Sequence, residues 1–142
     1  MNRVKDKVAI ITGGACGLGR AQALMLAEEG AKIIVTDINV AEGKKVVEEI
    51  KNRGLKAKFI KHDVTIERNW EEVIERTLSE FGRLDVLVNN AGIFFRKAIE
   101  ETSLAEWRRV ISVNLDGVFL GTKHAVAAMK RSGGDRLLIY RQ

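Results

Sequence analysis

Short, mainly apolar runs alternate with longer segments of helical periodicity along almost the whole chain, and no other feature constrains the fold as strongly. Mainly apolar runs of four to six residues indicate strands covered on both sheet faces, as in parallel β/α units. The sequence therefore predicts an α/β fold built on a doubly wound parallel sheet. The expected strands are 7–12, 32–36, 57–60, 84–88 and 137–140, and the expected helices are 17–29, 40–52, 66–81 and 104–130, with one break in the last helix near Ser112.

Composition favours one globular domain over residues 1–142. A chain of 142 residues can bury a core without disulfides or metals. Its 46% apolar and 30% charged fractions are ordinary for globular proteins. These values exclude a disordered tail protein, a collagen-like chain and a disulfide scaffold.

Three features predict a cytoplasmic protein without a membrane segment. Cys16 is the single cysteine, so no internal disulfide can form, which is typical of a reducing compartment. No apolar run approaches the 18 or more residues that a membrane span needs. The charged N-terminus is followed by a short apolar block, 8–11, whereas a secretory signal needs roughly 7–15 apolar residues.

The pattern of charge predicts no nucleic-acid partner. The formal net charge is +5, from 24 Lys and Arg against 19 Asp and Glu, but most basic residues are interleaved with glutamate. A nucleic-acid surface would show clustered charge and aromatic residues for stacking, and aromatics make up only 6% here. His62 and His124 are far apart with no cysteine near them, so we expect no metal site.

A glycine-rich turn follows the first expected strand and opens the first expected helix, with the sequence Thr12-Gly13-Gly14-Ala15-Cys16-Gly17-Leu18-Gly19. Glycines let a pyrophosphate approach the main chain, and the helix N-terminus favours its negative charge. Asp37 ends the second expected strand 18 positions after Gly19, close to the spacing of a carboxylate that binds ribose hydroxyls. A tight turn plus a surface aspartate is the structural alternative, but the two features together favour a dinucleotide site.

Asp37 also predicts NAD rather than NADP as the cofactor. A carboxylate at this position accepts from a ribose 2′-hydroxyl but repels a 2′-phosphate. Cys16, just before Gly17, is not basic, whereas an NADP site favours Arg or Lys near these positions.

Three polar motifs in the second half of the chain each leave two interpretations open. Asp63, followed by Val64, can reach an adenine amino group from the end of a strand, or it can cap the next helix. In the run 89–92, Asn-Asn-Ala-Gly, the asparagines can simply stabilise a turn, or the small residues can let the main chain approach a ribose. Asn114 in mid-helix is unfavourable without a reason, and is either a satisfied core amide or a water-binding site residue.

Together these motifs resemble the short-chain dehydrogenase/reductase family over residues 5–134. The resemblance implies a Rossmann-type sheet of order 3-2-1-4-5, truncated after strand five, and an oxidoreductase that oxidises secondary alcohols or reduces ketones with a nicotinamide cofactor. It also implies that the pyrophosphate lies beside Gly13, Gly17, Leu18 and Gly19, the adenosine ribose beside Asp37, and the adenine beside Asp63 and Val64. Asn90, Ala91 and Gly92 then lie against the cofactor, Cys16 and Ile38 are also expected to bind it, and Asn114 is the first member of the catalytic tetrad.

The resemblance further implies catalytic residues that this sequence does not supply. Hydride transfer needs a general acid/base, and the family uses a tyrosine, a lysine four residues later and a serine on strand five. Tyr140 is the only tyrosine, it falls within an expected strand, and no lysine follows it. Three hypotheses therefore stand: the parent dehydrogenase activity, a catalytically inactive NAD(H)-binding remnant, or a structural half-domain that neither binds nor reacts.

Residues 135–142 relate in an unusual way to the strand-five motif that the resemblance implies. One possible set of codons for residues 134–142 encodes a second peptide when it is read in the frame that starts two bases later. That peptide is Gly-Ser-Ile-Ile-Asn-Ile-Ser-Ser, which is the strand-five motif with its serine. We therefore expect that a frameshift at or near Gly134 produced the segment 135–142.

We also expect a homo-oligomer. A sheet that stops at strand five has an open edge and an uncovered helix face, and both promote association. The expected contact is either the strand-five edge or the long helix that contains Asn114.

Overall fold

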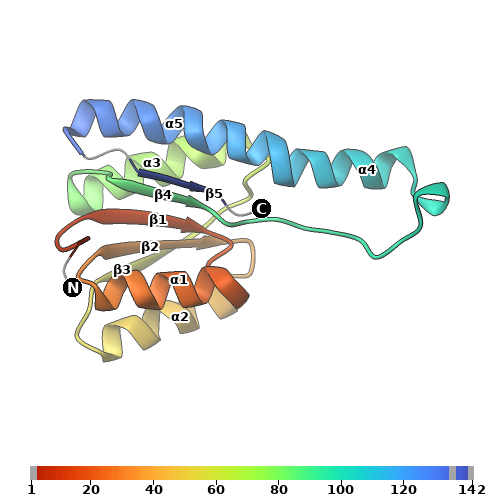
Figure 1. The fold of residues 1–142 in the computed structure, drawn as a ribbon. Coiled ribbons are helices and arrows are strands. Elements are labelled where there is room, and N and C mark those ends of the chain that lie inside the picture. Colours follow the sequence, from red (N-terminus) through yellow and green to blue (C-terminus); the bar gives the residue numbers. More distant parts are fainter. Residues whose placement is uncertain (1–2, 135–136, 141–142) are drawn as a thin grey trace.

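The computed structural model describes residues 3–134 and 137–140 and contains a parallel sheet of five strands (Figure 1). The strands are β1 (Val8–Thr12), β2 (Lys32–Asp37), β3 (Ala57–Lys61), β4 (Val86–Asn89) and β5 (Leu137–Tyr140). Their order across the sheet is β3-β2-β1-β4-β5, which confirms the predicted order. The strand order reverses between β1 and β4, and this switch point is where open α/β sheets bind ligands.

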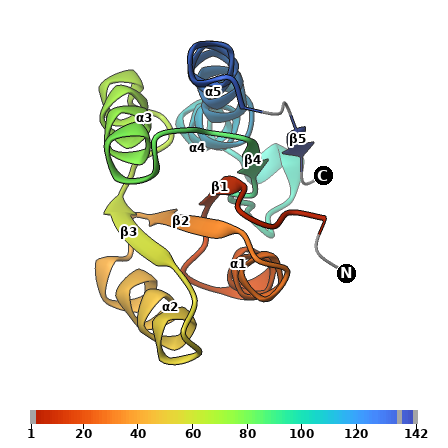
Figure 2. The same cartoon turned by 90° about the vertical axis from the view of Figure 1, so that its left-hand side faces the viewer.

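Helices cover both faces of the sheet (Figure 2). One face carries the first two of them and the other face carries the last two: α1 (Gly17–Glu28), α2 (Val40–Asn52), α3 (Glu67–Phe81) and α5 (Gly117–Ser132). Side chains along a strand point alternately to the two faces, so Ala9 and Ile11 pack toward α1 and α2, whereas Ile10 packs toward α3 and α5. This double burial is the physical reason why β1 is apolar on both of its sides.

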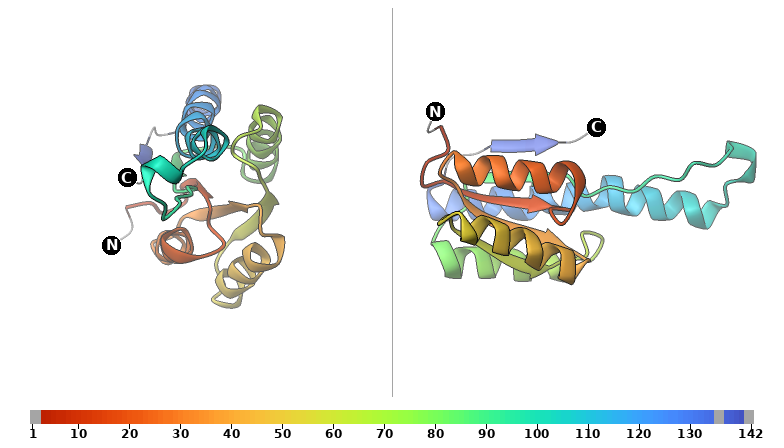
Figure 3. Two further views of the ribbon diagram at one scale, coloured as in Figure 1. Left: turned by 90° about the vertical axis from the view of Figure 1, so that its right-hand side faces the viewer. Right: turned by 90° about the horizontal axis from the view of Figure 1, so that it is seen from below.

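The segment after β4 leaves the body of the molecule and returns along a helix. A 3-10 turn, η1 (Ile99–Glu101), and α4 (Leu104–Ile111) project beyond the carboxyl ends of the strands (Figures 1 and 3). Ser103 caps α4 and forms a reciprocal capping box with Glu106. None of the residues of α4 is buried, so this arm has no core of its own.

The helix that contains Asn114 is continuous where the sequence predicts a break. Between α4 and α5 lies η2 (Ser112–Asp116), a π-helical turn whose flanking residues Ile111 and Gly117 keep right-handed helical angles. The prediction of a break near Ser112 is therefore wrong, because the regular α-helix is interrupted there only by a widened turn and the helix continues into α5. Such turns change which side chains face a neighbouring surface and occur frequently at functional sites.

Strand β4 begins two residues later than predicted. Asp85 is fully buried, and its side chain replaces part of the strand pairing: Oδ2 accepts from the Val8 N–H at 2.9 Å. The Asp85 N–H donates to the Val8 carbonyl oxygen at 3.0 Å, and Arg83 pairs with the same carboxylate. A buried carboxylate with these partners stays satisfied at the amino end of the strand.

Strand β5 includes Tyr140, in register with Asn89 of β4, so this tyrosine lies in a strand as expected. Residues 135–136 and 141–142 lie outside the described residues, and the frameshift origin of 135–142 stays a prediction. Among the residues that the structure describes, no helix combines the length and the apolar character that crossing a bilayer requires.

Candidate functional site

A cavity of about 690 Å³ lies at the carboxyl edge of the sheet, where the turns after β1, β2, β3 and β4 meet α4 and η2. Parallel α/β sheets bind their ligands at this edge, beside the switch point. The described residues that line the cavity are Gly13, Cys16, Gly17, Leu18, Asp37, Ile38, His62, Asp63, Val64, Thr65, Asn90, Ala91, Gly92, Ile93, Arg109, Ser112 and Val113.

Every residue predicted to contact a cofactor lines this cavity except Gly19. Gly19 is buried beneath the glycine turn, where a Cβ atom would collide with the Gly13 carbonyl oxygen and with Asn90 Nδ2. Gly13 has a φ of 62°, and a Cβ atom there would lie 2.9 Å from Ala91 Cα. Side chains at these two positions would push the neighbouring turns apart, so both require glycine for space, and Gly13 requires it for conformation as well.

Two side chains join the glycine turn to the turn after β4. Thr12 Oγ1 accepts from the N–H groups of Asn90 and Ala91, at 3.1 and 3.0 Å. Asn90 Nδ2 donates to the carbonyl oxygens of Thr12 and Gly13, at 3.0 and 3.1 Å. These bonds are buried or partly buried, so two walls of the cavity are fixed relative to each other.

Asp37 ends β2, and its carboxylate is held by main-chain donors from two directions. Oδ2 accepts from the Ala15 N–H in the glycine turn at 3.1 Å, and Oδ1 accepts from the Asn39 N–H at 2.9 Å. These bonds fix the carboxylate at the cavity wall. Each oxygen keeps acceptor capacity for a hydroxyl group of a ligand.

Asp63 organises the loop between β3 and α3. Its Oδ1 accepts from the N–H and the hydroxyl of Thr65, at 2.9 and 2.7 Å, and its N–H donates to Asn69 Oδ1 at 3.0 Å. The N-cap of α3 is Ile66, so the interpretation of Asp63 as the helix cap is wrong. Asp63 Oδ2 makes no hydrogen bond to a described residue, which leaves it to a donor on a ligand.

His62 is buried behind Asp63. Its Nδ1 lies 2.9 Å from Thr36 Oγ1, and its ring meets the Trp70 ring edge to face with centroids 4.3 Å apart. Burial outweighs the nearby Asp63 charge and lowers the pKa of His62 to about 4, so the imidazole is neutral at pH 7. Nε2 has no hydrogen-bond partner among the described residues.

Asn114 is exposed, so the core-amide interpretation is wrong. Its Nδ2 donates to the Ile93 carbonyl oxygen at 2.7 Å, and its Oδ1 accepts from the Ile93 N–H at 2.8 Å. This pair of bonds ties η2 to the loop after β4. Asn114 does not itself line the cavity, and its observed effect is to position Ile93, which does.

Six lining residues are not among the sequence predictions: His62, Thr65, Ile93, Arg109, Ser112 and Val113. Arg109, Ser112 and Val113 lie at i, i+3 and i+4, so they share one helical face. The spacing is visible in the sequence, but nothing there shows which face of the helix meets the edge of the sheet.

The charged residues of the cavity are few. Among its described lining residues, Asp37 and Asp63 carry negative charge and Arg109 is the one Lys or Arg. No group of three His, Cys, Asp or Glu residues within 3–134 and 137–140 could hold a metal ion. The two carboxylates accept hydrogen bonds, so the cavity suits an organic ligand with hydroxyl and amino groups.

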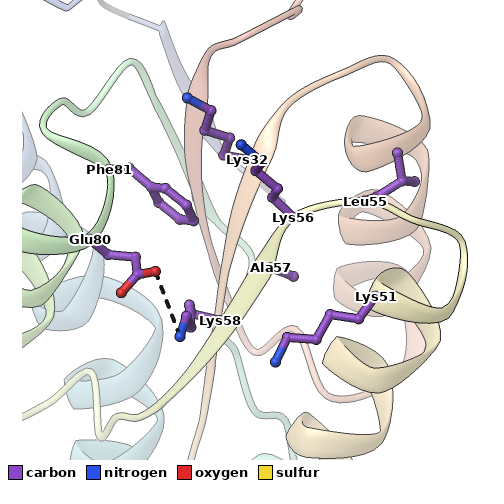
Figure 4. A pocket seen from close by; sticks show the side chains of 8 residues that line it. All are labelled: Lys32, Lys51, Leu55, Lys56, Ala57, Lys58, Glu80 and Phe81. Carbon is purple, nitrogen blue, oxygen red and sulfur yellow. Dashed lines mark ion pairs between the residues drawn. The ribbon is translucent and has the colours of Figure 1, made fainter.

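A second cavity, of about 430 Å³, lies at the opposite, amino-terminal edge of the sheet (Figure 4). Four lysines surround it, Lys32, Lys51, Lys56 and Lys58, and the last lies 3.6 Å from Glu80. The helices α2 and α3 end here, and lysines near helix C-termini stabilise the negative end of the helix dipole. Lys51 lies in the last turn of α2 and has this role, and the described lining contains no glycine turn.

Comparison with known proteins places the chain among dehydrogenases. The short chain dehydrogenase family model matches residues 7–139. A cyclopentanol dehydrogenase from Comamonas sp. is 43% identical over 132 residues, which are 93% of this chain and 53% of that protein. A trans-4-hydroxycyclohexanecarboxylate dehydrogenase from Sinomonas cyclohexanicum is 44% identical over 139 residues, 94% of this chain and 54% of that protein.

A third relative uses the phosphorylated cofactor. It is an NADP-dependent (R)-specific alcohol dehydrogenase from Lentilactobacillus kefiri, 42% identical over 132 residues, 93% of this chain and 52% of that protein. The chain therefore spans about half the length of the curated relatives it matches.

The environment of His62 predicts a stability that depends on pH. Its folded-state pKa lies below the ordinary value of 6.5, so the unfolded chain binds more protons as the pH falls between these values. The free energy of unfolding should decrease by about 2–3 kcal/mol from this group between pH 7 and pH 4.5. Urea unfolding at both pH values measures it. His62→Gln should lose this part of the decrease and His124→Gln should retain it; identical pH dependence in the wild type and His62→Gln would contradict the assignment.

Proposed function

Because the chain belongs to the short-chain dehydrogenase family, we propose that its cavity at the carboxyl edge of the sheet binds NAD(H). The parent activity that we propose is the NAD-dependent oxidation of secondary alcohols or the reduction of ketones. The bound nicotinamide supplies the hydride chemistry of such a reaction. The residues of this chain bind the dinucleotide and orient it.

The observation that carries this proposal is the glycine turn, held against the turn after β4 at the N-terminus of α1. No side chain fits at Gly13 or Gly19, so the two turns stay in close contact, and the glycine turn presents its main chain to the cavity at Gly13 and Gly17. The N-cap residue Cys16 makes no side-chain bond to the first turn of α1, which leaves those N–H groups to phosphate oxygens. These features fit the pyrophosphate of a dinucleotide.

The positions of the two carboxylates indicate which end of the cavity holds the adenosine half of the dinucleotide. Asp37 beside the glycine turn suits the hydroxyl groups of the adenosine ribose, and Asp63 Oδ2 suits the amino group of the adenine. The nicotinamide half then extends toward the turn at 90–92. Asn114 is a positioning residue in this arrangement, because it holds Ile93 next to that turn.

The relatives support the substrate class of the parent activity, since the name of one contains cyclopentanol and that of another contains (R)-specific alcohol. Proton transfer in that reaction needs the serine, tyrosine and lysine that the family resemblance implies, and loss of an acid/base alone costs about 10²–10⁴-fold in rate. We infer that these 142 residues bind NAD(H) without turning it over. NADH mixed with the chain and a panel of ketones should be oxidised no faster than without protein; measurable turnover would refute inactivity.

NAD rather than NADP is the cofactor that Asp37 favours. A 2′-phosphate would approach a carboxylate whose position is fixed by Ala15 and Asn39. The cation in the described lining, Arg109, lies on another wall of the cavity. The repulsion at Asp37 therefore has no neighbouring positive charge to offset it within the glycine turn.

Replacing Asp37 tests both the site and the cofactor preference. The wild type should bind NADH about tenfold more tightly than NADPH, and Asp37→Asn should reduce this preference to about threefold or less, because the charge is gone. Fluorescence titration with both cofactors measures the dissociation constants. Glu42→Gln removes a carboxylate of α2 outside the cavity and should leave the ratio unchanged; an unchanged ratio in Asp37→Asn would contradict the proposal.

We infer that the homo-oligomer forms through the α4–α5 helix. Leu104, Trp107, Leu115 and Phe119 recur at helical spacing and are each 52–63% exposed. Two such helices packed antiparallel about a two-fold axis near Ile111 bring Leu104 opposite Phe119 and Trp107 opposite Leu115. The alternative, the outer edge of β5, offers a strand of only four residues.

A charge on this surface should separate the subunits. Phe119→Glu should sediment as a monomer at concentrations where the wild type is a dimer, because a carboxylate cannot be buried without a partner. Analytical ultracentrifugation measures the difference. Met25→Glu places the same charge at an exposed apolar position of α1 and should remain dimeric. A monomeric wild type at high concentration would contradict the inference.

A further inference from the structure

We propose that Arg109 is a further ligand-binding residue of the cavity and that its guanidinium stacks on the adenine ring of the dinucleotide. This inference rests on the proposed function, since it concerns how the same cavity holds NAD(H). Arg109 would contact the base from α4, where neither the glycine turn nor the two carboxylates can reach it.

The position of Arg109 points to the adenine end of the cavity. Val113, one turn further along the same helical face, packs in the core cluster that contains Val64. Gly117, one turn further again, is so close to Val64 that a Cβ atom there would lie 2.8 Å from Val64 Cγ2. This face of the helix therefore stands over the loop of Asp63 and Val64, with Arg109 at its outer end.

The guanidinium of Arg109 is available to a ligand. Arg109 is exposed and forms no hydrogen bond or ion pair with a described residue. The nearest carboxylate along the helix, Glu106, is already bound to Lys97 and to the Ser103 N–H. The two carboxylates of the cavity, Asp37 and Asp63, accept bonds from their own loops.

A role at the end of a helix does not explain the placement of Arg109. Arginines in a last helical turn stabilise the helix dipole, and Arg108 would do so equally well. However, α4 continues through η2 into α5, so the negative end of the dipole does not lie here. What distinguishes Arg109 from Arg108 is that it lines the cavity.

The chemistry of the two partners is complementary. A guanidinium is planar and stacks on aromatic rings, and an adenine presents a flat π surface to it. The apolar side chains of Ile38 and Val113 also line the cavity and suit the faces of the base. The positive charge adds attraction for the phosphates of the dinucleotide at longer range.

The experiment titrates the whole chain with NADH by fluorescence and repeats the titration with AMP, which carries the adenine without the nicotinamide. Arg109→Ala should weaken both ligands about five- to tenfold. Arg109→Lys should recover only part of the affinity, because an ammonium keeps the charge without the planar group. Arg108→Ala removes the same charge from the neighbouring position and should stay within about twofold of the wild type.

The outcomes separate the inference from the function on which it rests. Equal NADH affinity in the wild type and Arg109→Ala, or an equal loss in Arg108→Ala, overturns the role of Arg109 and leaves NAD(H) binding intact. Absence of NADH binding to the unaltered chain overturns both. Loss confined to Arg109→Ala, with partial rescue by lysine, supports the stacking contact.

Discussion

The hydrogen bonds from the Asn90 side chain to the carbonyl oxygens at the end of β1 are the interaction on which the site depends. Strands β1 and β4 are distant in sequence but adjacent in the sheet, and both open into turns at the same edge. Leaving the buried main-chain groups of these turns unpaired would cost about 1–3 kcal/mol each. The Asn90 side-chain amide and the Thr12 hydroxyl form hydrogen bonds to four of these main-chain groups. These bonds hold the two turns together as a single surface.

The remaining walls of the cavity follow from this joined surface. The Asp37 carboxylate accepts from the Ala15 N–H, and this bond fixes the end of β2 relative to the glycine turn. The Asn114 side chain bonds to the main chain of Ile93, and this pair of bonds fixes the projecting helix relative to the turn after β4. Side chains from loops far apart in sequence therefore meet because each is bonded to the main chain of a neighbour.

The sequence predicts the elements well because β1, β2 and β4 are buried on both faces and therefore read as apolar runs. It also identifies the polar turns, since glycine and asparagine occur where strands end. The sequence-based prediction fails at two places. At the start of β4, the Asp85 carboxylate accepts the bond from the Val8 N–H in place of regular strand pairing. At 112–116, a π-helical turn interrupts the regular α-helix where the sequence predicts a break. Arg109 and Val113 escape notice because their part in the cavity depends on the rotation of one helix relative to the sheet.

We propose that the joined turns at the carboxyl edge bind NAD(H), in a chain that spans about half the length of the curated relatives it matches. Amide chemical shifts recorded by two-dimensional NMR as NADH is added would locate the binding site. We expect the shifts to change mainly at 13–19, 37–38, 63–65 and 90–93, with the lysine-lined cavity at the opposite edge unchanged. Shifts confined to Lys32, Lys56 and Lys58, or no shifts at millimolar NADH, would contradict it.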